Sequence, residues 1–502
     1  MLFLIFLVGI YFVRGVLLFR IYQKASENTW KAFIPIYGEI TLLKIVGKPA
    51  WWIIFLFIPG LNYFFGVVVA VELLKCFGRL KFGQHVLGVL FSFIYIPYLG
   101  FSTNENFYGS EYAKINNNRS PALDWIGTFL SVVLIIVFIR SFVFEFFTIP
   151  TPSSEETLMV DDYVMVSKLS YGPRIPMTPI GFPFTHNMMP YFGGPSYVTW
   201  LQLPYFRFPG FQKIHNNDLV VFNFPAENLG RPVDRKDYYI KRCVAAPGDS
   251  IQIIERSIFV NGKILPDPAN IEEGYRVLWS DTTLYNDLYN ELESFQVSHK
   301  YLIGGQLMKF KDLGIDASER IQDIRGPEID PKTGARIGMK ILMTPNAAKQ
   351  LKTWSEIKDV QVMTEPKEDS VDGKVFPDFP GMQWSKDNYG PLYIPKKGDH
   401  IPMTVSNYYV YQKAIRDYEN NPSLTLVGNQ VMLDGQPIKE YVMKMDYYFM
   451  MGDNRDNSED SRYWGFVPED HVVGKPLIIW LSLDHDVPWY KLVRWNRMFK
   501  VI

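Results

Sequence analysis

The sequence predicts N-terminal transmembrane α-helices followed by an all-β core that is interrupted by a mixed α+β insertion. Two observations lead to this fold class. Apolar residues crowd the first 150 of the 502 positions, and most charged residues follow them. After about residue 148, short β-branched and aromatic runs alternate with turn signals, which is typical of β-strands. The length suits about three domains.

The first half contains long apolar stretches. They are residues 2–13, 51–71, 86–102 and 125–147. The last stretch is long enough to cross a hydrocarbon core of about 30 Å. Positive charges follow the first stretch rather than precede it, which argues against a cleavable signal peptide. We interpret this stretch as an uncleaved membrane anchor, and a buried helix of a soluble protein is the alternative. We predict a membrane module over residues 1–120 with about three apolar segments, and a last transmembrane anchor over 121–148.

Lysine and arginine residues indicate the orientation. The loops at 20–50 and 103–124 carry five and two of them. Because short loops rich in these residues stay on the cytoplasmic side, both loops are expected inside, with everything after about residue 148 outside. Loop 76–85 would lie outside in this arrangement although it also carries lysine and arginine. A re-entrant segment 51–75 would change the number of spans.

The second half has the pattern of a β protein. We expect strands at residues 162–171, 218–222, 238–245, 250–254, 257–260, 441–451 and 477–482. Residues 173–210 hold eight prolines, which favours an extended ribbon over a central strand. Residues 250–440 are predicted to form an insertion between two parts of one core, 149–249 and 441–502. Short helices are expected in the insertion at residues 281–295 and 346–354.

Composition excludes several classes of protein. The chain has 51 Lys and Arg against 52 Asp and Glu, which argues against a nucleic-acid partner. Two cysteines cannot form a disulfide scaffold. The acidic loop 452–462 lacks the alternating ligands and terminal glutamate of a calcium loop. We therefore expect no metal and no cofactor.

Four motifs follow the last apolar stretch in order. They are Ile-Pro-Thr-Pro-Ser-Ser at 149–154, Asp-Leu-Val-Val-Phe at 218–222, Tyr-Ile-Lys-Arg-Cys-Val-Ala-Ala-Pro-Gly-Asp at 239–249 and Gly-Asp-Asn-Arg-Asp-Asn-Ser-Glu-Asp-Ser-Arg at 452–462. This set resembles the bacterial type I signal (leader) peptidases, membrane-anchored serine endopeptidases that remove signal peptides. Residues 27–102, with Trp-Lys-Ala-Phe-Ile-Pro-Ile-Tyr-Gly-Glu and Phe-Ile-Pro-Gly-Leu-Asn, resemble a small bacterial membrane domain of unknown function.

The resemblance implies the roles of individual residues. Ser153 takes the place of the family's nucleophile, and Lys241 takes the place of its general base. Ser458 corresponds to the serine that steadies the lysine. Thr151 is the hydroxyl that helps to hold the oxyanion, together with the backbone N–H of Ser153.

The nucleophile motif departs from the family's usual pattern. Pro152 stands where glycine is usual, and Ser154 stands where methionine is usual. Asp161 also replaces a usual glycine. Ser154 is therefore a rival nucleophile, and the altered stretch supports an alternative in which the chain is a catalytically impaired homologue with a binding or regulatory role.

Elementary chemistry supports a serine and lysine pair. No histidine lies in any motif, so a Ser-His-Asp triad has no support. A lysine acts as a base only when neutral, and burial among apolar groups lowers its reference pKa of about 10.4. Because side chains alternate along a strand, Lys241 can face the site while Arg242 faces away. From this segment alone, a solvated strand lysine would be the simpler interpretation.

The other expected site residues support the site or bind substrate. Ion pairs are expected between Asp453 and Arg242 and between Asp460 and Arg462; a polar surface loop is the alternative. A signal peptide would add as a strand along the site. We expect a shallow pocket for alanine, lined by Ile149, Leu158, Tyr239 and Ile240.

The sequence thus predicts a multi-pass protein of the cytoplasmic membrane with its catalytic domain on the outer, periplasmic face. Its partners would be preproteins and membrane lipid, which the ribbon 173–210 and the tail 489–497 would contact. A self-cleaving repressor-type Ser/Lys protease is an alternative, but the apolar segments argue against that soluble class.

Overall fold

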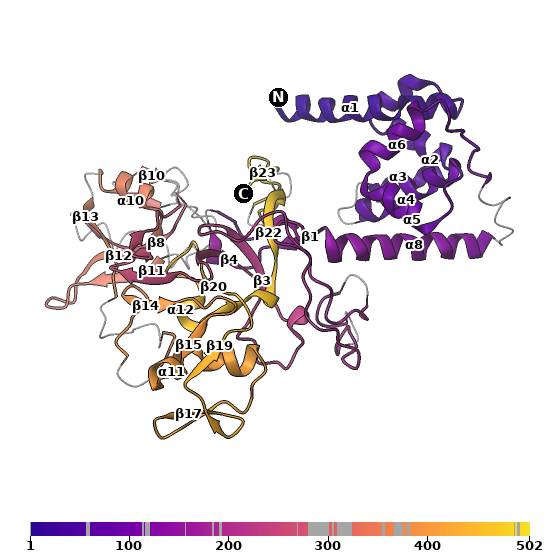
Figure 1. Ribbon diagram of the computed structural model, residues 1–502. Helices are drawn as coiled ribbons and strands as arrows, with labels where there is room; N and C mark the ends of the chain where they lie inside the picture. Colours follow the sequence, from indigo (N-terminus) through magenta and orange to yellow (C-terminus); the bar gives the residue numbers. More distant parts are fainter. Residues whose placement is uncertain are drawn as a thin grey trace. The chain divides into compact units, whose positions relative to one another are not determined.

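The chain folds as two compact units, Met1–Ser141 and Phe142–Ile502 (Figure 1). The computed structural model describes residues 2–56, 61–112, 115, 121–155, 157–182, 185–189, 193–268, 270–279, 301–303, 306–308, 324–353, 357–365, 375–378, 382–485, 487–488 and 492–502.

The first unit is helical. Its α-helices are α1 (Leu2–Lys24), α2 (Tyr37–Ile45), α3 (Ile53–Leu56), α4 (Leu61–Cys76), α5 (Phe82–Leu90), α6 (Ser92–Phe101) and α8 (Pro121–Phe142), with 3-10 turns at Thr29–Phe33 and Ala50–Trp52. Glycines with positive φ, Gly47 and Gly78, follow α2 and α4 and allow the chain to leave each helix. Buried side chains such as Ile21, Leu43 and Leu99 form one apolar cluster.

A buried polar contact ties α8 into this unit. Lys75 and Glu72 of α4 form an ion pair with an N–O distance of 3.2 Å. The hydroxyl of Thr128 on α8 donates a hydrogen bond to Glu72 over 3.1 Å. Charged groups in an apolar interior are stable only when paired, so these contacts hold the two helices together.

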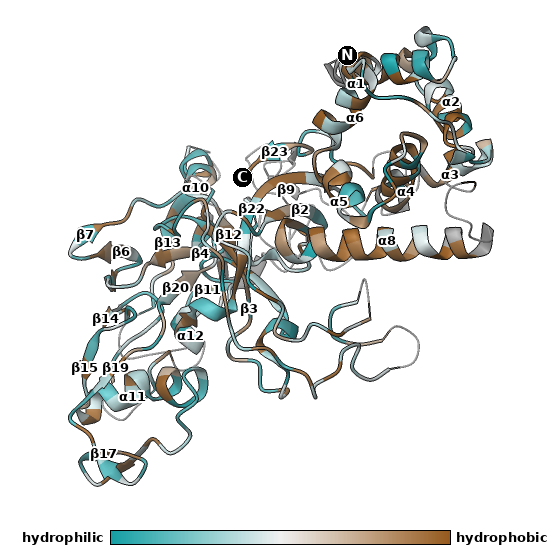
Figure 2. Cartoon of the chain, turned by 45° about the vertical axis from the view of Figure 1, so that its right-hand side comes forward, coloured by the Kyte–Doolittle hydropathy of each residue, from teal (hydrophilic) through white to brown (hydrophobic). Residues whose placement is uncertain are grey.

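In the described part of the chain, none of the helices is by itself both long and apolar enough to cross a membrane. The pair α5 and α6 meets those criteria together, but the two helices are bent by 106° at their junction. Residues Ile126–Phe142 of α8 form a shorter apolar helix, and Figure 2 shows α8 as hydrophobic over most of its length.

The last predicted anchor is shorter than expected. The sequence suggested an apolar helix up to residue 147, but α8 ends at Phe142 and Phe144–Thr148 forms strand β1. Strand β1 pairs along its whole length with β2 (Asp162–Ser167) in the second unit. Glu145, which is buried in β1, also forms an ion pair of 2.8 Å with Lys168, the residue after β2.

The second unit has a mostly-β core, as the sequence predicted. Its main sheet has the order β1-β2-β22-β3-β4-β20-β21, with β23 beside β22. The remaining bounds are β3 (Leu219–Asn223), β4 (Tyr238–Ala245), β20 (Tyr447–Met451), β21 (Val467–Pro468), β22 (Val472–Ser482) and β23 (Lys500–Val501). All these pairs are antiparallel, and β22, from the end of the chain, lies between β2 and β3. In β2, buried and half-buried side chains alternate, as expected for a strand with one face on the core.

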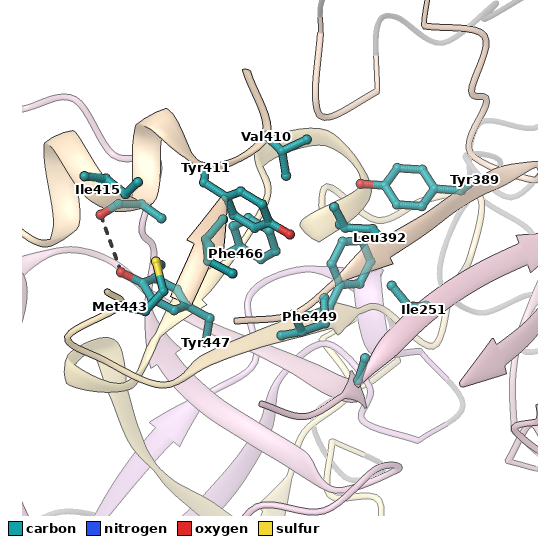
Figure 3. Close-up of a cluster of buried hydrophobic side chains, with 14 of the residues drawn as sticks. Ile251, Tyr389, Leu392, Val410, Tyr411, Ile415, Met443, Tyr447, Phe449 and Phe466 are labelled. Carbon is teal, nitrogen blue, oxygen red and sulfur yellow. Dashed lines mark hydrogen bonds between the residues drawn. The ribbon is translucent and has the colours of Figure 1, made fainter. Parts of the chain in front are cut away.

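A second hydrophobic core lies beside this sheet, and aromatic side chains such as Tyr411, Tyr447 and Phe449 fill it (Figure 3). The elements that contribute side chains to it are β5 (Ser250–Ile254), β6 (Ser257–Val260), β14 (Tyr389–Tyr393), β15 (His400–Pro402), α11 (Val405–Lys413), a π-helical turn (Ala414–Tyr418), β16 (Thr425–Val427), β17 (Gln430–Leu433), β19 (Glu440–Val442) and α12 (Ser461–Trp464). The short strands β7 (Lys263–Ile264) and β18 (Gln436–Pro437) are exposed at the edges of their sheets. Both ends of the predicted insertion 250–440 pack into this core, so we narrow the proposed insertion to the residues between β7 and β14.

The narrowed insertion contains its own four-stranded sheet, in the order β11-β12-β8-β13. Its elements are β8 (Glu273–Trp279), β9 (Tyr301–Ile303), β10 (Gln306–Met308), β11 (Ile324–Ile329), β12 (Arg336–Met343), α10 (Pro345–Leu351) and β13 (Ile357–Val362). Helix α10 covers most of the helix expected at 346–354. The helix expected at 281–295 lies outside the described residues.

The Pro-rich segment 173–210 forms no regular strand in its described part. Antiparallel bridges between Arg174 and Arg207 and between Gly181 and Tyr197 hold it as a ribbon. Several of its apolar side chains are exposed, Trp200 by 76%.

Candidate active site

Three segments that are far apart in the sequence meet at one cleft with a volume of about 580 Å³. The cleft is lined by Ile149, Pro150, Thr151, Pro152, Ser153, Tyr238, Tyr239, Ile240, Lys241, Asp456, Asn457, Ser458, Glu459 and Tyr463. The first segment follows β1, the second belongs to β4, and the third is the loop between β20 and α12. The structure thus brings the expected nucleophile, base and supporting hydroxyls into one cleft.

Ser153 lies in a 3-10 turn, Pro152–Ser154, on the cleft wall. Its hydroxyl is 3.5 Å from that of Thr151, and its carbonyl accepts a hydrogen bond of 3.2 Å from the N–H of Asn454. Ser153 is half-buried, whereas the rival Ser154 is only 1% exposed and does not line the cleft. The geometry therefore favours Ser153 as the residue that a substrate can reach.

Lys241 is a buried lysine at the centre of β4, where it lies opposite Val220 of β3. Its side chain is 3% exposed, yet it lines the cleft. Burial lowers the pKa of its amine from 10.5 to about 8; the nearby carboxylate of Asp460 opposes this shift, and Arg462 adds to it. About a tenth of the amine is therefore neutral at pH 7, far more than for an ordinary lysine, and a general base acts in this neutral form.

Ser458 lies on the cleft wall, in the loop that begins at Gly452. Its hydroxyl is buried and has no hydrogen-bond partner among the described residues. A Cβ atom on Gly452 would lie 2.2 Å from the Ser458 hydroxyl oxygen and 2.6 Å from the carbonyl oxygen of Ser153. Only glycine therefore allows the loop to pass between these residues. We missed Gly452 from sequence, although it begins the motif.

Two buried ion pairs fix this loop. Arg242 donates to both carboxylate oxygens of Asp453, over 2.7 and 2.6 Å. Arg462 donates to both oxygens of Asp460, over 2.9 and 2.8 Å. Asp460 also accepts the N–H of Gly452 over 3.1 Å, so the pair holds the loop close to Ser153. Arg242 lines a different cavity from Lys241, as expected for neighbours on a strand.

The expected substrate pocket differs at one position. Leu158 is 0% exposed and packs against Ile149 in a core cluster, so it does not line the cleft. Ile149, Tyr239 and Ile240 do line the cleft, and Tyr463 joins them.

Asp161, which stands where the family usually has glycine, lies in a turn whose backbone favours glycine. Asp161 has a φ of +63°, a backbone conformation that glycine adopts most easily. Its N–H donates to the carbonyl of Ile149, and the N–H of Ile149 donates to the carbonyl of Asp162, both over 2.9 Å. The turn therefore clamps the segment that leads to the nucleophile.

Among the described residues, no group of three or more His, Cys, Asp and Glu side chains is placed to hold a metal ion. The described residues that line the cleft include a serine and a buried lysine but no histidine. A mostly-β core with this cleft is the architecture of a serine peptidase.

Comparison with known proteins gives the family. The model of the family described as signal peptidase, peptidase S26, matches residues 122–308 and 394–481, and the chain belongs to this family. Residues 30–110 match a family of unknown function, DUF5684, in the region where the sequence resembled a small membrane domain.

Curated relatives agree with this assignment. Signal peptidase I of Buchnera aphidicola subsp. Acyrthosiphon pisum is 25% identical over 398 residues, which cover 79% of this chain and 86% of the relative. Signal peptidase I of Haemophilus influenzae is 24% identical over 386 residues, 76% of each chain. That of Rickettsia massiliae is 30% identical over 216 residues, 38% of this chain and 71% of the relative. The chain is therefore a hydrolase of the signal peptidase family.

Proposed function

We propose that this protein is a membrane-bound signal peptidase in which Ser153 is the nucleophile and Lys241 is the general base. The observation that carries the proposal is the burial of Lys241 on the wall of the cleft that exposes Ser153. A neutral Lys241 amine takes the proton of the Ser153 hydroxyl, and the oxygen attacks the scissile carbonyl. The N–H of Ser153 and the hydroxyl of Thr151 stabilise the oxyanion. The resulting ammonium group of Lys241 gives its proton to the leaving amine as the peptide C–N bond breaks, and the acyl group stays on Ser153. Lys241, neutral again, then takes a proton from the water that hydrolyses this acyl-enzyme, and Ser458 steadies the amine.

The substrate is proposed to bind as an added strand along β4. On one edge of β4, strand β3 pairs with Tyr238–Arg242, whereas on the other edge β20 pairs only with the second half, from Arg242 to Ala245. The backbone of the first half, Tyr238–Lys241, is therefore available to an extended peptide beside the cleft. Ile149, Tyr239 and Ile240 would form a shallow pocket for a small side chain such as alanine. These features suit the end of a signal peptide on a preprotein.

We further propose that the N-terminal unit and α8 anchor the enzyme in the cytoplasmic membrane, with the peptidase unit on the outer face. Support comes from apolar side chains on α8 that are exposed in the structure, including Ile126, Leu130 and Leu134. Lipid would cover these side chains, because exposed apolar surface of this kind is unfavourable in water. Labelling of single cysteines placed in the loops of intact cells would test this orientation; modification of loop 20–50 from outside would contradict it.

The proposed function is tested by cleavage of a preprotein. The purified full-length chain in detergent is incubated with a secretory preprotein, alongside the variants Ser153→Ala, Lys241→Ala and, as the control, Ser154→Ala. We expect cleavage by the wild type and by Ser154→Ala, and a loss of at least about 10³-fold for the other two. Equal cleavage by all four proteins would contradict the Ser/Lys mechanism. No cleavage by the wild type would favour an impaired homologue with a binding role.

A further inference from the structure

The loop that carries Ser458 is also held by residues outside the catalytic core. Asp456, two positions before Ser458, lines the cleft, yet its side chain is only 4% exposed. Its carboxylate accepts a hydrogen bond of 2.6 Å from Arg256. It also accepts the N–H of Gly274 over 2.7 Å and lies 3.1 Å from the amine of Lys386. None of these partners belongs to the four sequence motifs.

Arg256 connects four segments through one guanidinium group. Besides Asp456, it donates to Glu273 over 3.0 Å and to the carbonyl of Met363 over 2.6 Å. It also donates to Asp387 over 3.2 Å. These partners belong to β8, to the residues after β13 and to the segment before β14. The guanidinium therefore joins the insertion sheet to the catalytic loop, because its donors form a rigid planar fork.

The backbone at Arg256 indicates that the side chain is needed there. Glu255 and Arg256 form the two-residue turn between β5 and β6, with φ values of +44° and +72°. Such turns favour Asn-Gly, and a larger residue at positive φ costs about 1–2 kcal/mol. The ion pairs of Arg256 with the buried carboxylates of Asp456 and Asp387 offset part of this strain.

A second set of contacts joins the same two parts of the chain. The N–H of Glu272 donates to the carbonyl of Asp453, and the N–H of Arg455 donates to the carbonyl of Glu272, both over 2.9 Å. The side chain of Asn454 donates to the carboxylate of Glu272 over 2.7 Å. Glu272 and Asn454 thus form a parallel bridge directly beside Arg242 and its partner Asp453. The start of β8 therefore touches every residue from Asp453 to Asp456.

We infer that Arg256 is a positioning residue of the peptidase reaction: by fixing Asp456, it sets the position of Ser458 on the wall of the cleft that Lys241 also lines, and it couples the insertion sheet to the catalytic loop. The inference rests on the proposed function. The insertion then has a defined task, since it adds further support to a loop that the core holds through Arg242, Arg462 and the carbonyl of Ser153.

The variants Arg256→Lys and Arg256→Ala test this inference in the full-length enzyme. With a fluorogenic signal-peptide substrate, we expect kcat to fall about 10- to 100-fold for Arg256→Ala, with KM changed less than about twofold. Arg256→Lys keeps one ionic contact and should retain an intermediate kcat. The acidic limb of kcat/KM should move to higher pH, because a loosened loop admits water to Lys241 and its pKa returns toward the ordinary value.

The matched control is Arg276→Ala. Arg276 lies on β8 in the same sheet, and its ion pair of 3.0 Å with Glu328 stays within the insertion. This variant should keep the kcat and the pH profile of the wild type. A second variant, Asp456→Asn, is isosteric with the wild type and should shift the pH profile in the same direction as Arg256→Ala. It keeps the inference testable if Arg256→Ala does not fold.

Two results would overturn the inference. One is a variant Arg256→Ala that unfolds at a lower temperature but keeps the wild-type kcat and pH profile, which is the behaviour of a purely structural residue. The other is an equal loss of kcat in Arg276→Ala, which would mean that any weakening of the insertion has this effect. Failure of the proposed function is distinguishable, because then the wild type would not cleave or Ser153→Ala would remain active.

Discussion

At the scale of single residues, the chemistry depends on the charge of Lys241. Burial favours the neutral amine, Asp460 opposes that effect, and Arg462 adds to it. Because Arg462 also holds Asp460 in a buried pair, the carboxylate acts less on the lysine than a lone charge would. The motifs predict Ser153 and Lys241 as the reacting pair, and the structure places both on the wall of one cleft. They could not predict the buried position of Leu158 or the clearance at Gly452, since both depend on which distant segment packs there.

The pKa of Lys241 leads to a prediction on pH. The amine is active when neutral, and its pKa is lowered to about 8. Cleavage of a peptide should therefore increase with pH through about 8 and fall about tenfold for each pH unit below it. The measurement is kcat/KM between pH 6 and pH 9.5 at constant ionic strength. A profile without change across pH 8, or a limb near the ordinary lysine value, would contradict the assignment.

The variant Glu459→Gln should shift this limb to lower pH. Glu459 is exposed on the cleft wall, and its negative charge raises the pKa of Lys241 by favouring the charged amine. Removing that charge lowers the pKa, so the neutral base appears at lower pH. The shift should be a few tenths of a unit and should shrink with added salt, because an exposed charge is screened. A shift to higher pH would show that Glu459 acts by another route.

At the scale of elements, the close passage of the 452–458 loop past Ser153 sets the geometry of the cleft. The variant Gly452→Ala would place a methyl group 2.2 Å from the Ser458 hydroxyl oxygen. We expect peptide cleavage to fall by about 10²-fold or more, because the loop must move away from Ser153, and stability to fall by about 1–3 kcal/mol. Assays of kcat and of thermal unfolding measure the two effects.

The control for this prediction is Gly428→Ala, in the hairpin turn between β16 and β17. Gly428 has a φ of +60° and no atom within 4 Å of an added Cβ. That variant should lose stability through backbone strain while keeping the wild-type kcat. Equal activity losses in both variants would refute the steric argument at Gly452.

The turn before β2 allows a test of backbone strain. Asp161→Gly should be more stable than Asp161→Ala by about 1 kcal/mol, since only glycine accepts the φ of +63° without a steric penalty. Chemical denaturation measures the difference. Alanine and glycine variants of equal stability would show that the turn relaxes readily.

Some elements could not be predicted from the sequence. The apolar run up to residue 147 does not distinguish the end of a helix from an edge strand, because both are rich in apolar residues. The pairing of β1 with β2 and the ion pair between Glu145 and Lys168 distinguish a strand from a helix end here. Neither contact can be read from the sequence. We propose narrower insertion ends than the sequence indicated for a related reason, since residues such as Ile251 and Leu392 pack into a core that joins distant segments.

At the scale of the whole molecule, the peptidase unit is predicted to fold without the first unit. The main β sheet and the hydrophobic core beside it lie within Phe142–Ile502. A fragment that starts at residue 142 should unfold cooperatively and cleave a short peptide with a kcat within about threefold of the full chain. A fragment without residues 472–502 should not fold, because β22 lies between β2 and β3. An unfolded 142–502 fragment would contradict the division.

The measurement that tests the central claim most directly is the labelling of the nucleophile by a serine-reactive peptide ending in alanine. Mass spectrometry of the digested full-length enzyme should place the label on Ser153, and the rate of labelling should increase with pH through about 8. Lys241→Ala should remove the labelling, while Arg276→Ala should not affect it. Labelling of Ser154, or labelling of Ser153 at an unchanged rate in Lys241→Ala, would contradict the account.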